Sequence, residues 1–151
     1  IDDETLEYGN RLKCSLCGRK NKAKKTISIY KPPKILVIHI KRFIRNNYGI
    51  LTRKLTNHIK YPIIDFDISD YISEESPFKH HNKYNLFAVN KHYELGSYGN
   101  INAGHYTSII KNKFNNKWYE FNDSLDVRYI DNPNEIISKN AYLLFYYRTT
   151  N

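Results

Sequence analysis

The chain has 151 residues, the length of one ordinary domain. Hydrophobic residues make up 40% and charged residues 26%, which excludes a fibrous or wholly disordered chain. No apolar run approaches the ~20 residues that a membrane span needs, so we expect no membrane partner. The net charge of +9 permits nucleic-acid binding but is weak evidence for it, and we expect no nucleic-acid partner.

Alternating and apolar patterns predict strands along most of the chain. In chain order, the predicted strands cover residues 24–30, 35–40, 84–89, 105–111, 117–121 and 141–147. The run at 35–40 is almost continuously apolar and β-branched, which is typical of a strand buried on both faces. One short helical turn is predicted from Asn132 or Pro133 to about Ser138. The sequence therefore predicts an α+β, β-rich fold, a mainly antiparallel twisted sheet with few short helices.

The chain contains no methionine and begins Ile1-Asp2-Asp3-Glu4, so we expect it to be a piece of a larger protein. A sheet taken from a larger protein exposes a face that the rest would cover. We therefore expect exposed apolar surface and a tendency to self-associate.

The two cysteines stand close together in Cys14-Ser15-Leu16-Cys17-Gly18. Two thiolates at this spacing can bind one edge of a tetrahedral zinc ion, and the following glycine permits a tight turn. Alternatively, the pair are free thiols in a turn. Two cysteines are too few for a disulfide framework, and indirectly they favour a reducing, intracellular compartment, the cytoplasm or the nucleus.

The most suggestive histidine is His105, at the start of a predicted strand. If strands 105–111 and 117–122 form a hairpin that turns midway between residues 113 and 114, His105 lies opposite Asn122, with Cβ atoms about 4.5–5.5 Å apart. An amide oxygen there could orient the imidazole ring, as in Cys-His-Asn proteases. Since side chains alternate along a strand, Asn122 and Asp123 should point to opposite faces unless a bulge intervenes, and only one of them can be the direct partner of the ring. The alternative is an ordinary strand-end histidine beside a turn.

Six segments in the same order resemble the ubiquitin-specific proteases. Gly104-His105-Tyr106-Thr107-Ser108, followed by Lys117-Trp118-Tyr119-Glu120-Phe121-Asn122-Asp123-Ser124, is similar to that family's histidine box. The other segments lie at residues 33–43 (with Lys41-Arg42-Phe43), 54–71, 84–92 (ending in His92) and 141–146. The resemblance covers the chain from about residue 10 to 148.

The resemblance implies a papain-like cysteine peptidase that acts on ubiquitin and ubiquitinated proteins. Such an enzyme hydrolyses the isopeptide or peptide bond after ubiquitin's C-terminal glycine and needs no cofactor for catalysis. The resemblance implies that His105 is the catalytic base, Asn122 the orienting member of the triad and Asp123 a helpful neighbouring acid. It implies that Gly104 and Tyr106 line the channel for the ubiquitin tail, where a glycine leaves room for the substrate backbone. Residues 94–103 would form a loop that closes over that tail.

The resemblance also implies an organisation of the chain. Residues 1–30 would be the end of a zinc-fingers-like arm and residues 31–151 the β-rich palm of one larger catalytic domain. Cys14 and Cys17 would be the second pair of ligands of a structural zinc site. Nothing in the chain matches the family's cysteine box, so we expect the nucleophile elsewhere in the intact protein and no hydrolysis by this chain alone. The alternative is a catalytically inactive relative that binds ubiquitin or serves as a scaffold.

Overall fold

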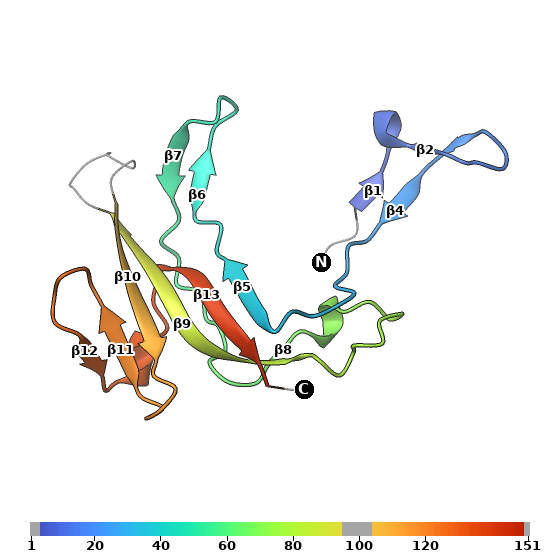
Figure 1. The fold of residues 1–151 in the computed structure, drawn as a ribbon. Coiled ribbons are helices and arrows are strands. Elements are labelled where there is room, and N and C mark those ends of the chain that lie inside the picture. The colour runs from blue at the N-terminus through green and yellow to red at the C-terminus, as the bar shows by residue number, and fades with distance from the viewer. Residues whose placement is uncertain (1–3, 95–103, 150–151) are drawn as a thin grey trace.

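The structure is a computed structural model that describes residues 4–94 and 104–149. Its centre is a seven-stranded sheet. The strands of this sheet are β5 (Ile35–His39), β8 (Phe66–Asp67), β9 (Lys83–Glu94), β10 (Gly104–Lys111), β11 (Trp118–Phe121), β12 (Arg128–Ile130) and β13 (Ala141–Arg148). Their order is β12-β11-β10-β9-β13-β5, with β8 added against β9, and every pairing is antiparallel. Figure 1 shows the long strand β9 running through the middle of this sheet.

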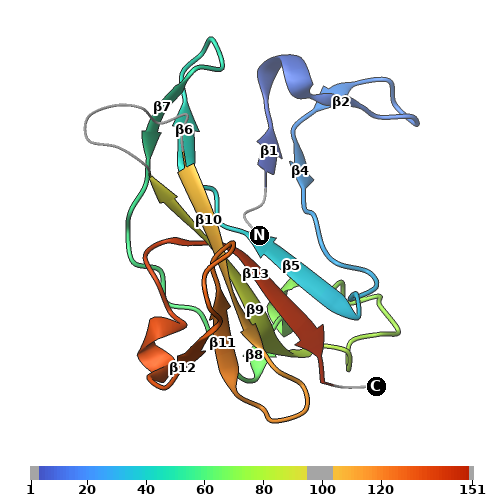
Figure 2. The same cartoon turned by 60° about the vertical axis from the view of Figure 1, so that its left-hand side comes forward.

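Two smaller units project from the same side of the sheet (Figures 1 and 2). The N-terminal arm contains two short pairs, β1 (Glu4–Leu6) with β4 (Ala23–Lys25) and β2 (Leu12–Lys13) with β3 (Lys20–Asn21). The second unit is a hairpin of β6 (Phe43–Arg45) and β7 (Leu51–Lys54).

Helical structure in the described residues is limited to three single-turn 3₁₀ helices, η1 (Tyr8–Asn10), η2 (Ser69–Tyr71) and η3 (Pro133–Glu135). The predicted helical turn is confirmed at η3, where the Asn132 side chain caps the helix by accepting a hydrogen bond from the Asn134 N–H. None of the described helices has the length and apolar character of a membrane span. The predicted β-rich, mainly antiparallel fold with few short helices is confirmed.

The core uses tyrosines whose hydroxyl groups reach backbone carbonyls. Tyr61 donates to the Ile136 carbonyl at 2.6 Å, Tyr84 to Pro33 at 2.6 Å and Tyr146 to Pro62 at 2.9 Å. A buried tyrosine is stable when its hydroxyl finds such a partner, so each ring adds apolar area without an unpaired polar atom. Burial raises the pKa of Tyr61 to about 12, which keeps its hydroxyl a donor.

The edge strand β5 differs from its prediction. Leu36 and Ile38 pack against the core, but Ile35 and Val37 are 49% and 50% exposed. The reason is that Ile35 and Val37 lie on the face of the sheet opposite the core, where Tyr147, which pairs with Ile35, is also 39% exposed. A continuous apolar run does not reveal by itself which of its faces is covered. The expected exposed apolar surface is present here.

The strand predicted at residues 24–30 is also only partly correct. The arm strand β4 ends at Lys25, and the chain then continues as an extended segment. Ile29 forms a single bridge to Ile72, with its N–H donating to the Tyr71 carbonyl at 2.7 Å. Ile29 alone in this segment packs against the core, whereas Ile27 is 62% exposed, so the alternating pattern does not mark a buried face here.

Arg42 fixes the base of the β6–β7 hairpin. Its side chain is fully buried, with Nε donating to the Ala141 carbonyl at 2.6 Å and Nη1 donating to the carbonyls of Leu55 and Asn57, each at 3.0 Å. The arginine thereby ties the hairpin to the start of β13. Burial lowers the pKa of Arg42, so the cation is held at an energetic cost that these carbonyls offset.

Candidate active site

The structure brings His105 and Asn122 together. His105 is the second residue of β10, and Asn122 directly follows β11. The His105 Nε2 atom lies 2.5 Å from the Asn122 Oδ1 atom. An amide oxygen only accepts hydrogen bonds, so this contact assigns the ring hydrogen to Nε2. The lone pair on Nδ1 is then available to take a proton from another group.

The register of the β10–β11 hairpin differs from its prediction by two residues. Ser108 pairs with Phe121 and Ile109 with Glu120, so the ladder does not place His105 directly opposite Asn122. The turn is longer than predicted and runs from Asn112 to Lys117, whose backbone groups close it at 2.8 Å. A shift of two residues keeps every side chain on its predicted face. The predicted contact is therefore present, although the predicted direct opposition is wrong.

The chain reverses immediately after Asn122. Asp123 has a φ angle of 47°, and the Leu125 N–H donates to the Asn122 carbonyl at 3.0 Å. Aspartate tolerates this left-handed conformation better than most residues. Asn122 is thus the residue between the end of β11 and this turn.

Asn122 is the direct hydrogen-bond partner of the ring, and Asp123 also lies near the ring without forming such a bond. Its Oδ2 atom lies 3.6 Å from His105 Nδ1, which is beyond hydrogen-bond distance. The strand alternation behind the prediction ends at Phe121, and the left-handed turn replaces it. Because the Asp123 side chain is 74% exposed, water screens its attraction for a protonated ring.

Gly104 has a reason within the protein itself to be glycine. A Cβ atom at this position would lie 1.9 Å from the Nε2 atom of His92, on the neighbouring strand β9. The space beside Gly104 that was expected to admit a substrate backbone is therefore filled, on the side of β9, by the His92 imidazole ring.

The His92 ring that fills this space is itself tightly packed. Its centroid lies 4.7 Å from that of Tyr106 and 5.1 Å from that of Phe43, both in edge-to-face contacts. Burial lowers the pKa of His92, and the positive charge of Lys54 lowers it further, so the ring is held neutral. The sequence alone gave no sign that His92 and Gly104 fit against each other.

Tyr106 is half-exposed beside Gly104, and its ring also lies 6.1 Å from that of Tyr142. Its predicted role in a substrate channel stays a prediction. The loop expected at residues 94–103 lies, apart from Glu94, outside the described residues.

A buried charged cluster beside the pair was missed by the sequence reasoning. Glu120, on the same face of β11 as Asn122, contacts Lys91 on β9 and Arg128 on β12. The sequence did contain a sign of this cluster, because a strand with residue 122 on the core-facing side also directs residue 120 to that side. A glutamate at a core-facing position needs a cationic partner.

Cys14 and Cys17 occupy the turn between β2 and β3. The Cys14 N–H donates to the Arg19 carbonyl, the Gly18 N–H donates to the Cys14 carbonyl, and Gly18 has the positive φ angle, 69°, that this tight turn requires. Backbone N–H groups of Cys17 and Leu16 lower the pKa of the Cys14 thiol, so the turn favours a thiolate.

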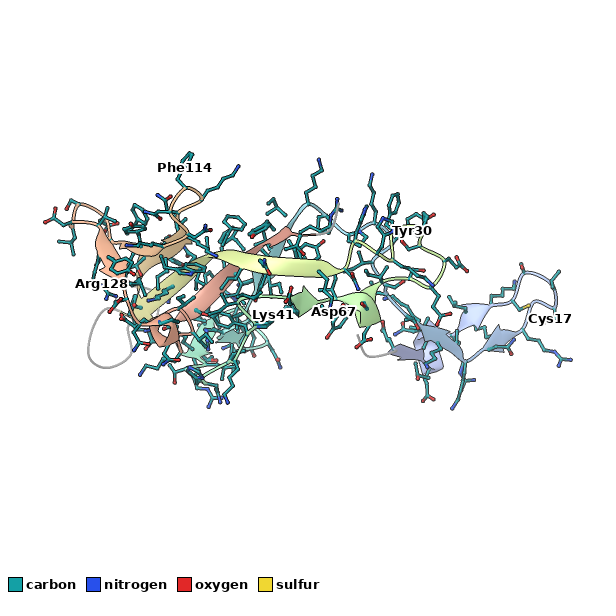
Figure 3. The ribbon with its side chains drawn as sticks, turned by 90° about the horizontal axis from the view of Figure 1, so that it is seen from below. Cys17, Tyr30, Lys41, Asp67, Phe114 and Arg128 are labelled. Atoms are coloured by element: carbon teal, nitrogen blue, oxygen red, sulfur yellow. The ribbon has the colours of Figure 1, made fainter. Side chains whose placement is uncertain are left out.

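The two thiols of this turn lie far from the histidine. No group of three or more His, Cys, Asp or Glu side chains that could hold a metal occurs among residues 4–94 and 104–149. The thiolates suit zinc chemically, but a tetrahedral site needs two further ligands. Figure 3 shows Cys17 at the opposite end of the molecule from Arg128 of β12 and from Phe114, in the turn between β10 and β11.

Comparison with known proteins places these features in context. The profile of the ubiquitin carboxyl-terminal hydrolase family matches residues 5–146. Mouse ubiquitin carboxyl-terminal hydrolase 4 is 35% identical over 145 residues, which is 96% of this chain and 14% of that protein. Human ubiquitin carboxyl-terminal hydrolase 15 is 37% identical over 135 residues, covering 89% of this chain and 13% of that protein. The chain thus spans a small part of the length of these relatives.

Among solved structures, the chain is similar to the yeast SAGA DUB module, which contains Ubp8, bound to monoubiquitin. The TM-score is 0.78 at 32% identity, and the match covers 99% of this chain and 31% of that one. The likeness thus extends over both the arm and the sheet.

Proposed function

Because this chain belongs to the ubiquitin carboxyl-terminal hydrolase family, we propose that it is the part of a thiol-dependent deubiquitinating enzyme that supplies the general base. The substrate is ubiquitin joined to a protein through its C-terminal glycine. The observation that carries this proposal is the 2.5 Å contact between His105 Nε2 and Asn122 Oδ1, which leaves Nδ1 as the basic atom.

The chemistry follows from that arrangement. Nδ1 of His105 takes the proton of a cysteine thiol, and the thiolate attacks the carbonyl carbon of the terminal glycine. The imidazolium then gives the proton to the departing amine as the C–N bond breaks, leaving a thioester. Nδ1 next takes a proton from water, whose oxygen attacks the thioester, and returns it to the departing thiolate. Asn122 holds the ring in the tautomer that all these steps require.

The cysteine of this reaction comes from another segment. The chain has two cysteines, and both lie in the arm turn far from the β10–β12 part of the sheet (Figure 3). The nucleophile therefore has to approach His105 from outside these 151 residues.

The neighbouring residues have supporting roles in the same proposal. Tyr106, half-exposed beside Gly104, lines the channel for the ubiquitin tail. Asp123 adds a weak, solvent-screened attraction for the imidazolium that forms on His105.

We also propose that Cys14 and Cys17 are one half of a structural zinc site in the intact enzyme. Support comes from the glycine-closed turn and from the backbone N–H groups that favour a thiolate at Cys14. In this organisation residues 1–30 are the end of a fingers-like arm and residues 31–151 the palm. Reduced thiols suit an enzyme of the cytoplasm or nucleus.

The test is the reaction of the natural protein containing this chain with ubiquitin that carries a thiol-reactive group at its C-terminus. A covalent adduct, with one ubiquitin per molecule, is the expected result. A folded protein that binds ubiquitin but forms no adduct would instead be an inactive ubiquitin-binding relative. Absence of both binding and adduct would overturn ubiquitin as the substrate.

A further inference from the structure

The carboxylate of Glu120 lies at the centre of a charged cluster within the sheet. Its side chain is 15% exposed, and that of its partner Lys91 is 6% exposed. Oε1 accepts a hydrogen bond from Lys91 Nζ at 3.2 Å. Oε2 accepts from Arg128, at 3.1 Å from Nε and 2.6 Å from Nη2. One side chain of β11 thereby joins β9 to β12.

The cluster lies on the face of the sheet that carries the His105–Asn122 pair. Thr107 stands two residues after His105, and Glu120 pairs with Ile109, so strand alternation directs these side chains to one side. The contact with His105 places the Asn122 side chain on the same side. The Thr107 hydroxyl lies 3.4 Å from Glu120 Oε1, within reach of a weak hydrogen bond. The carboxylate, which β11 carries, therefore also contacts β10 and links the two strands next to the pair.

Glu120 is held in its charged form. Burial opposes ionisation, but hydrogen bonds from Arg128 and the positive charge of Lys91 outweigh it and lower the pKa of the Glu120 carboxyl. Arg128 Nη2 also donates to Glu135 of η3 at 2.8 Å, which completes an electrically balanced group. The Lys91–Glu120 pair is largely buried, whereas Arg128 is half-exposed. A buried ion pair adds little net stability compared with apolar residues, so a role in fixing geometry explains the Lys91–Glu120 pair better.

The backbone pairing of β11 ends before Asn122, so other contacts have to fix the end of this strand. Its last backbone pair with β10 is Phe121 with Ser108, and its last pair with β12 is Glu120 with Arg128. Asn122 lies beyond both ladders, in the turn that begins at Asp123. Glu120 is thus the last residue within β11 on this face, and side-chain contacts tie it to β9, β10 and β12.

We propose that Glu120 is a positioning residue, which acts through Lys91, Thr107 and Arg128 to hold the end of β11 where Asn122 Oδ1 meets His105 Nε2. The inference rests on the proposed function, because the position of Asn122 affects turnover only if His105 is the base. Glu120 itself touches neither the substrate nor the reacting atoms.

A double-mutant cycle in the natural enzyme tests the proposal. Glu120→Gln should lower kcat for a ubiquitin reporter by about tenfold, with KM within about twofold, because a misplaced catalytic group costs rate and not binding. In an Asn122→Ala background the same substitution should change kcat by less than about twofold, because the Asn122 amide that Glu120 positions is already gone. Multiplicative losses in the double variant would show that Glu120 is merely structural and overturn the proposal.

Two further variants keep this result interpretable. Glu135→Gln, which removes the other carboxylate on Arg128, is the matched control and should leave kcat within about twofold. If Glu120→Gln alone fails to fold, Glu120→Gln with Lys91→Gln removes both buried charges and should fold with the same loss of kcat. Full activity in that folded double variant would contradict the proposal.

A readout in the 151-residue chain needs no activity and separates this inference from the proposed function. The ¹⁵N shifts of His105 report which ring nitrogen carries the hydrogen. The unsubstituted chain should show hydrogen on Nε2, and Glu120→Gln should give a mixture of tautomers, while Glu135→Gln should not. If the His105 ring of Glu120→Gln still carries its hydrogen on Nε2 alone, the positioning role is refuted, whether or not ubiquitin is the substrate.

Discussion

Asn122 Oδ1 lies 2.5 Å from His105 Nε2, although both residues lie beyond the last backbone pair that joins their strands. The ladder between β10 and β11 ends at Ser108 and Phe121, and the chain turns at the left-handed Asp123 directly after Asn122. The contact therefore depends on a turn and on side chains, and single substitutions should disrupt it without unfolding the sheet.

The first prediction concerns the group that orients the ring. In the natural enzyme, Asn122→Ala should lower kcat by ~100-fold, the cost of misplacing a catalytic group by about 1 Å. Asn122→Asp keeps an acceptor oxygen and should retain most of the rate. Steady-state kinetics with a ubiquitin reporter measure both. Equal activity in Asn122→Ala and the unsubstituted enzyme would show that Asn122 does not orient His105.

The second prediction concerns the fit between Gly104 and His92. Gly104→Ala should destabilise the chain by about 1–3 kcal/mol, because the added methyl group meets the His92 ring. Gly9→Ala is the matched control, since nothing lies within 4 Å of a Cβ atom at that glycine. Chemical denaturation of the 151-residue chain gives both values.

A second substitution tests the cause of that loss. Adding His92→Gly to Gly104→Ala removes the clashing ring and should make the methyl group harmless. The effect of Gly104→Ala should therefore be smaller in the His92→Gly background than in the unsubstituted chain. Equal effects in the two backgrounds would mean that the ring and the glycine do not compete for space.

The third prediction is that the 151-residue chain alone hydrolyses no ubiquitin conjugate. Its two cysteines lie in the arm turn, away from the β10–β12 part of the sheet (Figure 3), so no thiol reaches His105. Incubation with a fluorogenic ubiquitin substrate at high chain concentration measures this. The contradicting result would be cleavage that persists in the Cys14→Ser, Cys17→Ser double variant and is lost in His105→Ala. It would mean that the chain contains a nucleophile other than cysteine.

The fourth prediction concerns zinc. In the natural enzyme, replacing both Cys14 and Cys17 with serine should remove one bound zinc ion per molecule and lower the melting temperature, since a structural zinc contributes to folding. Ser15→Ala, in the same exposed turn, is the control and should change neither. If elemental analysis finds the same zinc content in the cysteine variant, Cys14 and Cys17 do not bind zinc.

Part of the active-site geometry could be predicted from the sequence. Strand alternation and the spacing of two segments predict that His105 and Asn122 share a face, and they do. The register was wrong because the Asn112–Lys117 turn contains a left-handed Asn116 (φ 59°), and the sequence does not specify which of several asparagines takes that conformation. The two-residue error left the face unchanged because strands have a period of two.

Other features depended on contacts between distant segments. The exposure of Ile35 and Val37 shows that one face of the sheet is uncovered at β5, which the apolar run of that strand does not encode. The Glu120 cluster joins residues from three strands and η3, and the His92–Gly104 fit spans two. Each requires the three-dimensional pairing of strands before it becomes visible.

The most direct test of the central claim is the turnover of a ubiquitin reporter by the natural enzyme with His105→Ala. If His105 is the base, turnover should fall by at least about 10²–10⁴-fold, the usual contribution of general acid–base catalysis, while ubiquitin still binds. His58→Ala, at an exposed histidine outside the site, should keep full activity. Turnover by the folded His105→Ala variant at the rate of the His58→Ala control would contradict the claim.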